Sequence, residues 1–354
     1  MAAQGRCDAP DQPTVRFDRA TRIRRGSDPA VVLAAALTLL APATTPAENR
    51  AALTLATWNI EHLAAADGAG CRPRAASDYQ RLRDVAARLD ADIVAVQEVQ
   101  STDALARVFD PEVYDLVVSA RREDGRDFCR GMNDQRRLAQ RTGFAIDRDA
   151  LRAAGLEHRV SAGVRELGVE GRRWGTRIQI EVDDQPLLEL MSLHLKSGCA
   201  WGGLEGRVRR EQCQILKRQR GILDAWIDAR AAADAPFVIL GDFNRQLDQP
   251  NDHFWQDIDD GEVCDWRPDP TLGRRCKPGS SQPDPDADLV LAGAGRPFPY
   301  AYNPKYPYAI DHIVLGGSAA DWLVRGSWRV LDYGGGAKPS DHHPIAVTLR
   351  LPTE

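Results

Sequence analysis

Short apolar segments that end in polar residues recur along this chain, and they limit the folds it can adopt. Residues 53–58 predict a strand, and the continuously apolar run 92–96 predicts a second strand buried on both faces. Few helical patterns lie between the strands. So many strands predict two packed sheets with helices outside. Further strands are expected at 114–118, 143–147, 176–182, 187–194, 237–241, 311–315 and 344–351.

Two helices are expected among these strands. Ser77 can serve as the N-cap of a helix whose Leu82, Val85 and Leu89 share one face. A longer amphipathic helix fits residues 205–230. With 43% hydrophobic and 27% charged residues, the composition argues against a disordered chain or a multi-span membrane protein.

The N-terminal segment has the character of an export signal. Residues 30–41 form an apolar run, shorter than the roughly 20 residues needed to cross a bilayer. Arginines precede the run and the Ala-Pro-Ala string at 41–43 follows it, which is the order of a secretory signal. We therefore expect residues 1–47 to be an extension plus a removable signal, and residues 50–352 to form a single domain. The protein is then secreted or periplasmic, without a stable membrane span.

The number of cysteines agrees with export. The chain has seven cysteines, and Cys7 lies in the expected export segment, so an even set of six remains. In an oxidising compartment six cysteines can form up to three disulfides. Proximity favours the pairs Cys199–Cys213 and Cys264–Cys276. Zinc is the competing use, but the C-x-x-C spacing of many zinc sites is absent from the sequence.

Polar residues gather where the predicted strands end, although burial in a core would not place them there. On an extended backbone Asn59 and Glu61 point to one face, as do Asp242 and Asn244. Each cluster alone is typical of a structural histidine or a capping aspartate. Together they supply carboxylates, asparagines and histidines without cysteine, a set that suits Mg²⁺ or Mn²⁺ and phosphoryl transfer. The clusters are 58–62, 97–99, 192–196, 241–244, and 310–312 with 340–344.

In their order these motifs resemble the endonuclease/exonuclease/phosphatase superfamily. That superfamily includes pancreatic-type deoxyribonucleases, exonuclease-III-type repair nucleases, bacterial sphingomyelinases and inositol-phosphate phosphatases. The resemblance covers about residues 52 to 351 and implies an α/β fold, a four-layer αββα sandwich of two packed mixed β-sheets with outer helices. The motifs are TWNIE at 57–61, VQEV at 96–99, LH at 193–194, LGDFN at 240–244, IDH at 310–312 and SDHHP at 340–344.

The resemblance also implies a metal-dependent hydrolase that uses Mg²⁺, with Mn²⁺ as an alternative. Glu98 is then the expected metal carboxylate, with Asn59 beside it. Either Glu61 or Asp341 would complete or support the metal shell.

The same resemblance implies catalytic roles for five residues. Asp311 would orient His342, because a carboxylate fixes the tautomer of an imidazole and stabilises its protonated form. Asp242 and Asn244 would hold the scissile phosphate and the attacking water. His194 matches the branch of the family that has histidine here, whereas the repair-type branch has tyrosine. In-line attack of water is expected, with His342 and His194 sharing proton transfer and with Asp242 and His342 as alternative water activators.

Other nearby residues are assigned to support or binding. His312 and His343 are strand neighbours of the proposed catalytic residues and would point to opposite faces, so they are interpreted as packing residues. His62 receives the same interpretation. Lys196 would share a face with His194 and is a candidate phosphate contact, with an ordinary surface lysine as the alternative.

The formal net charge of −5 conceals a basic sector. Residues 121–177 contain fourteen arginines and nine acidic residues, whereas residues 242–290 are acidic. A basic sector can follow a nucleic-acid backbone without reading its sequence, although a solvated face of mixed charge is the alternative. The expected contacts are Arg172, Arg173, Arg177 and Trp174.

The favoured function is therefore a secreted nuclease that cleaves DNA, or RNA. A sphingomyelinase-like phospholipase C, or another small phosphodiester or phosphomonoester hydrolase, is the main alternative. A lipid substrate would require exposed apolar loops, for which tyrosines 300, 302, 306 and 308 are candidates. Inositol phosphates are disfavoured, because FNRQ at 243–246 and AIDH at 309–312 replace that branch's signatures.

A catalytically inactive binding module is the alternative from another class. The complete set from Asn59 to His342 argues against it. The acidic segment 257–262 does not have the spacing of a calcium loop, so structural Ca²⁺ has no support from the sequence. We expect a monomer.

Overall fold

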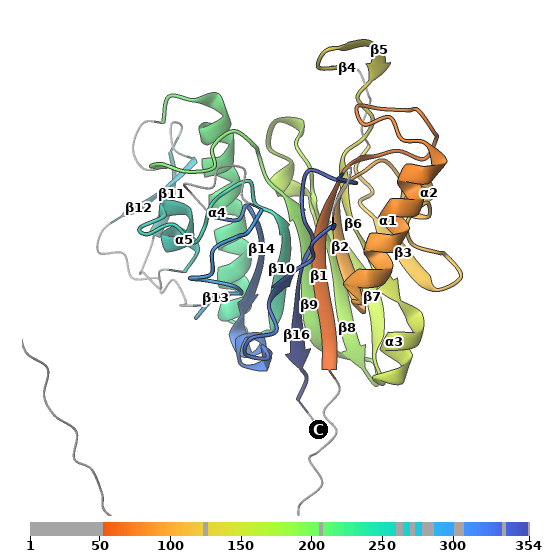
Figure 1. Cartoon of the computed structure of the whole chain (residues 1–354). Helices are drawn as coiled ribbons and strands as arrows, with labels where there is room; N and C mark the ends of the chain where they lie inside the picture. Colours follow the sequence, from red (N-terminus) through yellow and green to blue (C-terminus); the bar gives the residue numbers. More distant parts are fainter. Residues whose placement is uncertain are drawn as a thin grey trace, which may run out of the picture. The chain divides into compact units, whose positions relative to one another are not determined.

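The computed structural model describes residues 52–122, 127–204, 208–259, 265–269, 273–277, 287–300, 308–334 and 338–352. Within them, two six-stranded mixed sheets pack face to face, as the predicted sandwich requires (Figure 1). The first sheet has the order β15-β16-β1-β2-β6-β3 and the second the order β13-β14-β10-β9-β8-β7.

The strands of the two large sheets are spread along the whole described chain. The first sheet contains β1 (Ala52–Leu63), β2 (Ile93–Val99), β3 (Tyr114–Val118), β6 (Arg141–Asp147), β15 (Arg329–Val330) and β16 (Ile345–Arg350). The second contains β7 (Glu157–Val164), β8 (Gly175–Val182), β9 (Gln185–His194), β10 (Phe237–Asp242), β13 (Val290–Leu291) and β14 (Asp311–Gly316).

Short hairpins and helices complete the described elements. The hairpins are β4 (Phe128–Cys129) with β5 (Met132–Arg136), and β11 (Asp265–Asp269) with β12 (Gly273–Lys277). The helices are α1 (Ala76–Leu89), α2 (Thr102–Leu105), α3 (Arg148–Ala153), α4 (Glu211–Ala231), α5 (His253–Ile258) and the 3-10 turns η1 (Arg165–Gly171) and η2 (Gly317–Trp322). None of the described helices combines the length and apolar character that a bilayer span needs.

The core follows from the alternation of side chains along the strands. Leu53 and Leu55 of β1 point between the sheets, where they join Leu190 and Leu240 in one buried cluster. The intervening β1 residues face α1, so this central strand is buried on both faces. Burial on both faces explains why apolar residues predominate on both faces of β1, with Thr54 and Thr57 as the polar exceptions before the residues at its end.

Helices cover the outer faces, α1 on the first sheet and α4 on the second (Figure 1). The predicted start of each helix is wrong. The N-cap of α1 is Ala75, whose backbone N–H donates to Asp78 over 2.8 Å, so Ser77 lies inside the first turn. Helix α4 begins at Glu211, because apolar periodicity cannot mark a start where 205–210 offers no Ser, Thr, Asp or Asn cap.

Strand directions bring the polar strand ends to one edge of the sandwich. Strand β1 is parallel to β2, and β9 is parallel to β10, so their carboxyl ends meet there. Strand β14 runs antiparallel to β10, and its first residue, Asp311, pairs with Asp242. On the other side of β10 the partner of Asp242 is His194. The sheet register alone therefore places three predicted site residues in one row.

Candidate active site

Breaks in the extended backbone shape the end of the first sheet. Glu61, His62 and Glu98 have positive φ angles of 49°, 51° and 62°, and the pairing of β1 with β2 shifts register between Asn59 and Leu63. Such conformations cost about 1–3 kcal/mol each and cluster at functional sites. The prediction that Asn59 and Glu61 share one face of an extended strand is therefore wrong, because the bulge ends the two-residue alternation.

The bulge gives Glu61 a bridging position. Its backbone N–H donates to Asn59 Oδ1 over 3.0 Å, and its Oε2 accepts the N–H of Asp341 over 3.0 Å. Burial, followed by the charge of Asp341, raises the pKa of Glu61. Asp341, far from Glu61 along the chain, therefore lies close enough to disfavour the charge of Glu61.

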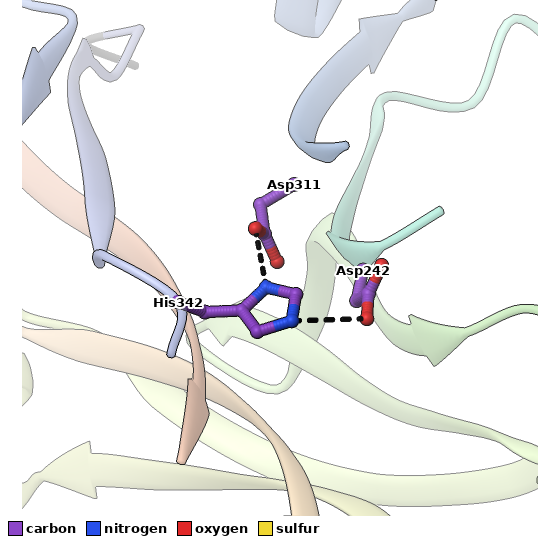
Figure 2. A group of neighbouring side chains, drawn as sticks. All are labelled: Asp242, Asp311 and His342. Carbon is purple, nitrogen blue, oxygen red and sulfur yellow. Dashed lines mark hydrogen bonds and ion pairs between the residues drawn. The ribbon is translucent and has the colours of Figure 1, made fainter. Parts of the chain in front are cut away.

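His342 and Asp311 form a hydrogen-bonded pair (Figure 2). The distance from His342 Nδ1 to Asp311 Oδ2 is 2.7 Å, and the opposite nitrogen, Nε2, lies 3.8 Å from Asp242 Oδ2. Burial lowers the pKa of His342, but the carboxylates of Asp311 and Asp242 outweigh it and raise that pKa well above its usual value. The ring is therefore held as an imidazolium between two acidic groups.

Asp242 is held rigidly at the end of β10. One carboxylate oxygen accepts the N–H of Asn244 over 2.8 Å, and the other accepts the amide of Asn59 over 3.1 Å. Its side chain is buried, which raises the pKa of this carboxyl to about 7, with Asp311 adding to the rise. Asp242 thus changes its charge near neutral pH, unlike an ordinary aspartate.

His194 is buried beside Asp242 and has the opposite electrostatic character to His342. Its Nε2 lies 3.2 Å from Asp242 Oδ2 and 3.9 Å from Glu98 Oε1. Its Nδ1 has no hydrogen-bond partner among the described residues. Burial, followed by the positive charge of Arg173, lowers its pKa well below the usual value. His194 is therefore a neutral imidazole.

A pocket of about 620 Å³ lies over these groups. Asn59 and Asp311 do not line it, but they hold Asp242 and His342 from behind through the hydrogen bonds given above. The predicted residues that line the pocket are Glu61, Glu98, His194, Lys196, Asp242, Asn244, Asp341, His342, Arg172 and Arg173.

Two predicted substrate contacts are not brought to this pocket. Arg177 lies on β8, where its Nε is 2.6 Å from Glu189 Oε1. The indole of Trp174 lies against Gly168 and the guanidinium of Arg165. Neither residue lines the pocket. Strand β8 alternates its side chains between the two faces of the sheet, and a count of arginines along the sequence does not detect that alternation.

Several residues that sequence reasoning missed do line the pocket. His62, interpreted as a packing residue, lies there with Nε2 3.7 Å from Glu98 Oε2, because its left-handed backbone turns it away from the strand. Its place directly after the motif at 57–61 was the only signal in the sequence. The others are Phe128, Arg130, Arg137, Gln140 and Ser197, together with Cys71 and Cys129.

The remaining histidines near the motifs pack as expected. His312 is buried, and its Nε2 is 2.8 Å from the carbonyl oxygen of Arg245. His343 stacks between Tyr300 and Tyr333, with ring centroids 3.7 and 4.2 Å away. Tyr300 is thus a packed residue, not an exposed lipid contact.

Among the described residues there are two disulfides. The predicted pair Cys199–Cys213 is confirmed, and Cys71–Cys129 was not foreseen, because 58 residues separate its members. The other predicted pair cannot be followed, since Cys264 and the side chain of Cys276 lie outside the part of the chain that the structure describes. Residues 1–47, 260–262, Tyr302 and Tyr306 also lie outside the described residues.

The clustered Asp242, Asp311 and His342 also have metal-binding geometry, since one ligand atom from each lies within 4.8 Å of the others. The hydrogen bond between His342 and Asp311 favours a proton-handling pair instead. Within the same pocket, Glu98 and Asp341 offer further carboxylate oxygens.

A two-sheet α/β sandwich with carboxylates and histidines at the strand ends defines a class of phosphoester hydrolases. The chain belongs to the Endonuclease/Exonuclease/phosphatase family, whose sequence profile matches residues 56–342. Members of this family are hydrolases that act on phosphodiester bonds, and they generally use a divalent metal ion. Among curated proteins, none matches this chain in sequence.

Solved structures share the fold at low identity. Humanized TDP2 of D. rerio is 16% identical with a TM-score of 0.52, covering 84% of this chain and 98% of its own. Truncated TDP2 of Caenorhabditis elegans is 14% identical with a TM-score of 0.50, covering 84% and 98%. The human Nocturnin catalytic domain is 14% identical with a TM-score of 0.50, covering 85% and 94%.

Proposed function

We propose that this protein is a secreted, Mg²⁺-dependent nuclease that hydrolyses the phosphodiester bonds of DNA, or RNA. The observation that carries this proposal is a single pocket lined by His342, Asp242 and Glu98 together with Lys196, Arg172 and Arg173. Asp311 holds His342 from behind this lining. Acid–base groups, a metal carboxylate and phosphate-binding cations are the parts that hydrolysis of a polyanionic diester requires.

The donor set fits a divalent cation. Four carboxyl groups line one pocket, and burial together with like charge raises the pKa of Glu61 and of Asp242. A bound cation would offset this repulsion, and oxygen donors without cysteine suit Mg²⁺ or Mn²⁺. Glu98 would hold the ion, with Glu61 or Asp341 in support. Asn59, predicted beside Glu98 in the metal shell, does not line the pocket and instead steadies Asp242 through its amide. The ion would stabilise charge on the phosphate and on the leaving oxygen.

Proton transfer falls to the group formed by Asp311, His342 and Asp242. Asp311 holds His342 Nδ1, so Nε2 faces Asp242 across 3.8 Å, which is too long for a direct hydrogen bond. An oxygen of water or of the phosphate that lies to one side, in the pocket, can therefore be within hydrogen-bond distance of both groups. In this arrangement Asp242, with its pKa of about 7, accepts a proton, and the imidazolium of His342 supplies one.

His194 serves a different role in this proposal, because its low pKa keeps it neutral at pH 7. A neutral ring that is 3.2 Å from Asp242 can donate a hydrogen bond to a phosphate oxygen but is a poor acid. The two histidines therefore do not share proton transfer in this proposal: His342 supplies the proton, and His194 donates a hydrogen bond to the phosphate.

Positive charge in the pocket supports a phosphate-rich substrate. Burial, followed by the nearby Arg172 and Arg173, lowers the pKa of Lys196. Like-charged groups held this close are stabilised by an anion, and successive phosphates of a nucleic acid supply one. The two described disulfides support an oxidising, extracytoplasmic location.

The test is incubation of the protein with plasmid DNA, RNA and sphingomyelin vesicles, each with Mg²⁺ and with EDTA. We expect nicking of the plasmid that EDTA abolishes and that Glu98→Gln and His342→Asn each reduce at least a hundredfold. Asp321→Asn, in the turn η2, is the matched control because Asp321 does not line this pocket. Turnover of sphingomyelin alone would replace the nuclease with the phospholipase alternative.

A further inference from the structure

The hairpin formed by β4 and β5 presents an aromatic side chain to the pocket. Phe128 is 54% exposed and is the single large hydrophobic residue, among those exposed in the described chain, that lines the pocket. Met132 of the same hairpin is also exposed but does not line it. The hairpin projects beyond the two large sheets at the end where β4 and β5 are labelled in Figure 1. Phe128 therefore contributes little to the core.

Covalent attachment holds this hairpin at the site. An isolated two-stranded hairpin is marginally stable in water, and this one buries neither Phe128 nor Met132. Cys129 is buried and bonded to Cys71, which lies in the segment that follows Glu61 and His62 along the chain. Both cysteines line the pocket. The disulfide thus links the hairpin that carries Phe128 to the segment that follows Glu61, a residue of the expected metal shell.

Charged groups around Phe128 favour a nucleotide as its partner. The guanidinium of Arg136 lies 5.0 Å from the centre of the Phe128 ring, and Arg130 lines the same pocket. An aromatic face combined with guanidinium groups beside a phosphodiester site is how proteins hold unstacked bases and their phosphates. A base inside a duplex is stacked on both neighbours, so a side chain can stack only on an unpaired base.

We propose that Phe128 is a specificity residue that stacks on an unpaired nucleobase flanking the scissile phosphate. Arg130 contacts the adjoining phosphate, and the Cys71–Cys129 disulfide positions both residues. The protein then prefers single-stranded DNA or frayed strand ends to the interior of a duplex. This inference rests on the proposed nuclease function and assigns its substrate class.

The test compares two single-stranded substrates of equal length and charge. One is a thymidine oligonucleotide, and the other is a polymer of abasic deoxyribose phosphates. The quantity measured is the ratio of their kcat/KM values with Mg²⁺ present. We expect Phe128→Ala to lower this ratio about tenfold to a hundredfold, as loss of one base-stacking contact does. Phe128→Trp should keep the ratio, because a larger aromatic ring also stacks.

Two further variants separate stacking from general damage to the hairpin. Met132→Ala removes an exposed apolar residue from the same hairpin outside the pocket, and the ratio should not change. The double variant Cys71→Ser/Cys129→Ser should lower the ratio as Phe128→Ala does, because the hairpin is then no longer bonded covalently beside the pocket. An unchanged ratio in the double variant would remove the disulfide from the proposal.

The outcomes distinguish this inference from the proposed function. If the unmodified protein cleaves neither these oligonucleotides nor plasmid DNA nor RNA with Mg²⁺, the nuclease function fails and the inference fails with it. If it nicks plasmid DNA but cleaves neither oligonucleotide, only the inference fails. If it cleaves the thymidine oligonucleotide but Phe128→Ala leaves the ratio unchanged, only the stacking role is overturned. A preference of the unmodified protein for duplex over single strands would also overturn it.

Discussion

Replacement of Asp311 by asparagine tests the electrostatic centre of the proposed mechanism. Asp311 is buried at the start of β14, and its Oδ2 lies 2.7 Å from His342 Nδ1. The change keeps the size of the side chain and a hydrogen-bonding group but removes the negative charge. His342 then has only Asp242 and the more distant, exposed Asp341 to stabilise its protonated form.

The size of the effect follows from Coulomb's law. The charges of an imidazolium and a carboxylate are delocalised, so a separation of about 4 Å between charge centres is appropriate for this contact. At an effective dielectric constant of about 20 the attraction is about 4 kcal/mol. Each 1.36 kcal/mol corresponds to a tenfold change in rate, so about 4 kcal/mol predicts a lower pKa for His342 and about a thousandfold loss of kcat/KM.

Two measurements check this prediction. The pKa of His342 is followed by NMR of its ring protons, and kcat/KM is measured on the thymidine oligonucleotide. We expect both to fall in Asp311→Asn and neither to change in Asp321→Asn, whose carboxylate lies in η2 away from the pocket. A pKa for His342 that moves by less than half a unit, with activity within tenfold of the parent protein, would refute the reasoning.

Three other predictions concern the framework around the site. Arg245→Met leaves the buried carboxylate of Asp252 without its partner at 2.7 Å, so the free energy of unfolding in urea should fall by about 3–5 kcal/mol; a loss below about 1 kcal/mol would contradict this. Cys199→Ser/Cys213→Ser opens a crosslink between residues 14 apart, and the same measurement should show a loss of about 3 kcal/mol. Because the folded pKa of Asp242, about 7, exceeds its unfolded value, the metal-free folded state binds more protons. Its stability in EDTA should therefore decline between pH 5 and 7 by up to about 1.4 kcal/mol per pH unit, and a decline that persists in Asp242→Asn would show that another group is responsible.

The polar strand ends were predictable because they follow from rules local to each strand. Alternating or continuous apolar residues mark β1, β2, β9 and β10, and each run stops at a polar residue such as Gln97, His194 or Asp242. The register of β10 with its neighbours β9 and β14 could not be predicted from the sequence. That register decides which three polar residues form a row, and it depends on packing between segments far apart in the chain.

Local rules failed where the backbone leaves its regular conformation. The bulge after Asn59 brings Glu61 to Asp341 and turns His62 into the pocket, so strict alternation misplaced His62. Arginine content likewise predicted Arg177 as a substrate contact, whereas the pleat of β8 directs it to Glu189. A composition count carries no information about which face of a sheet a residue occupies.

The sequence by itself determined the class of fold, the family and the types of side chain available for phosphodiester hydrolysis, because these depend on hydrophobic periodicity and on motifs of a few adjacent residues. Tertiary structure decided the raised pKa values of Asp242 and His342, the Cys71–Cys129 disulfide and the position of Phe128 over the pocket. Burial, electric field and loop closure all arise between residues that are distant along the chain, so they exist only once the two sheets have packed.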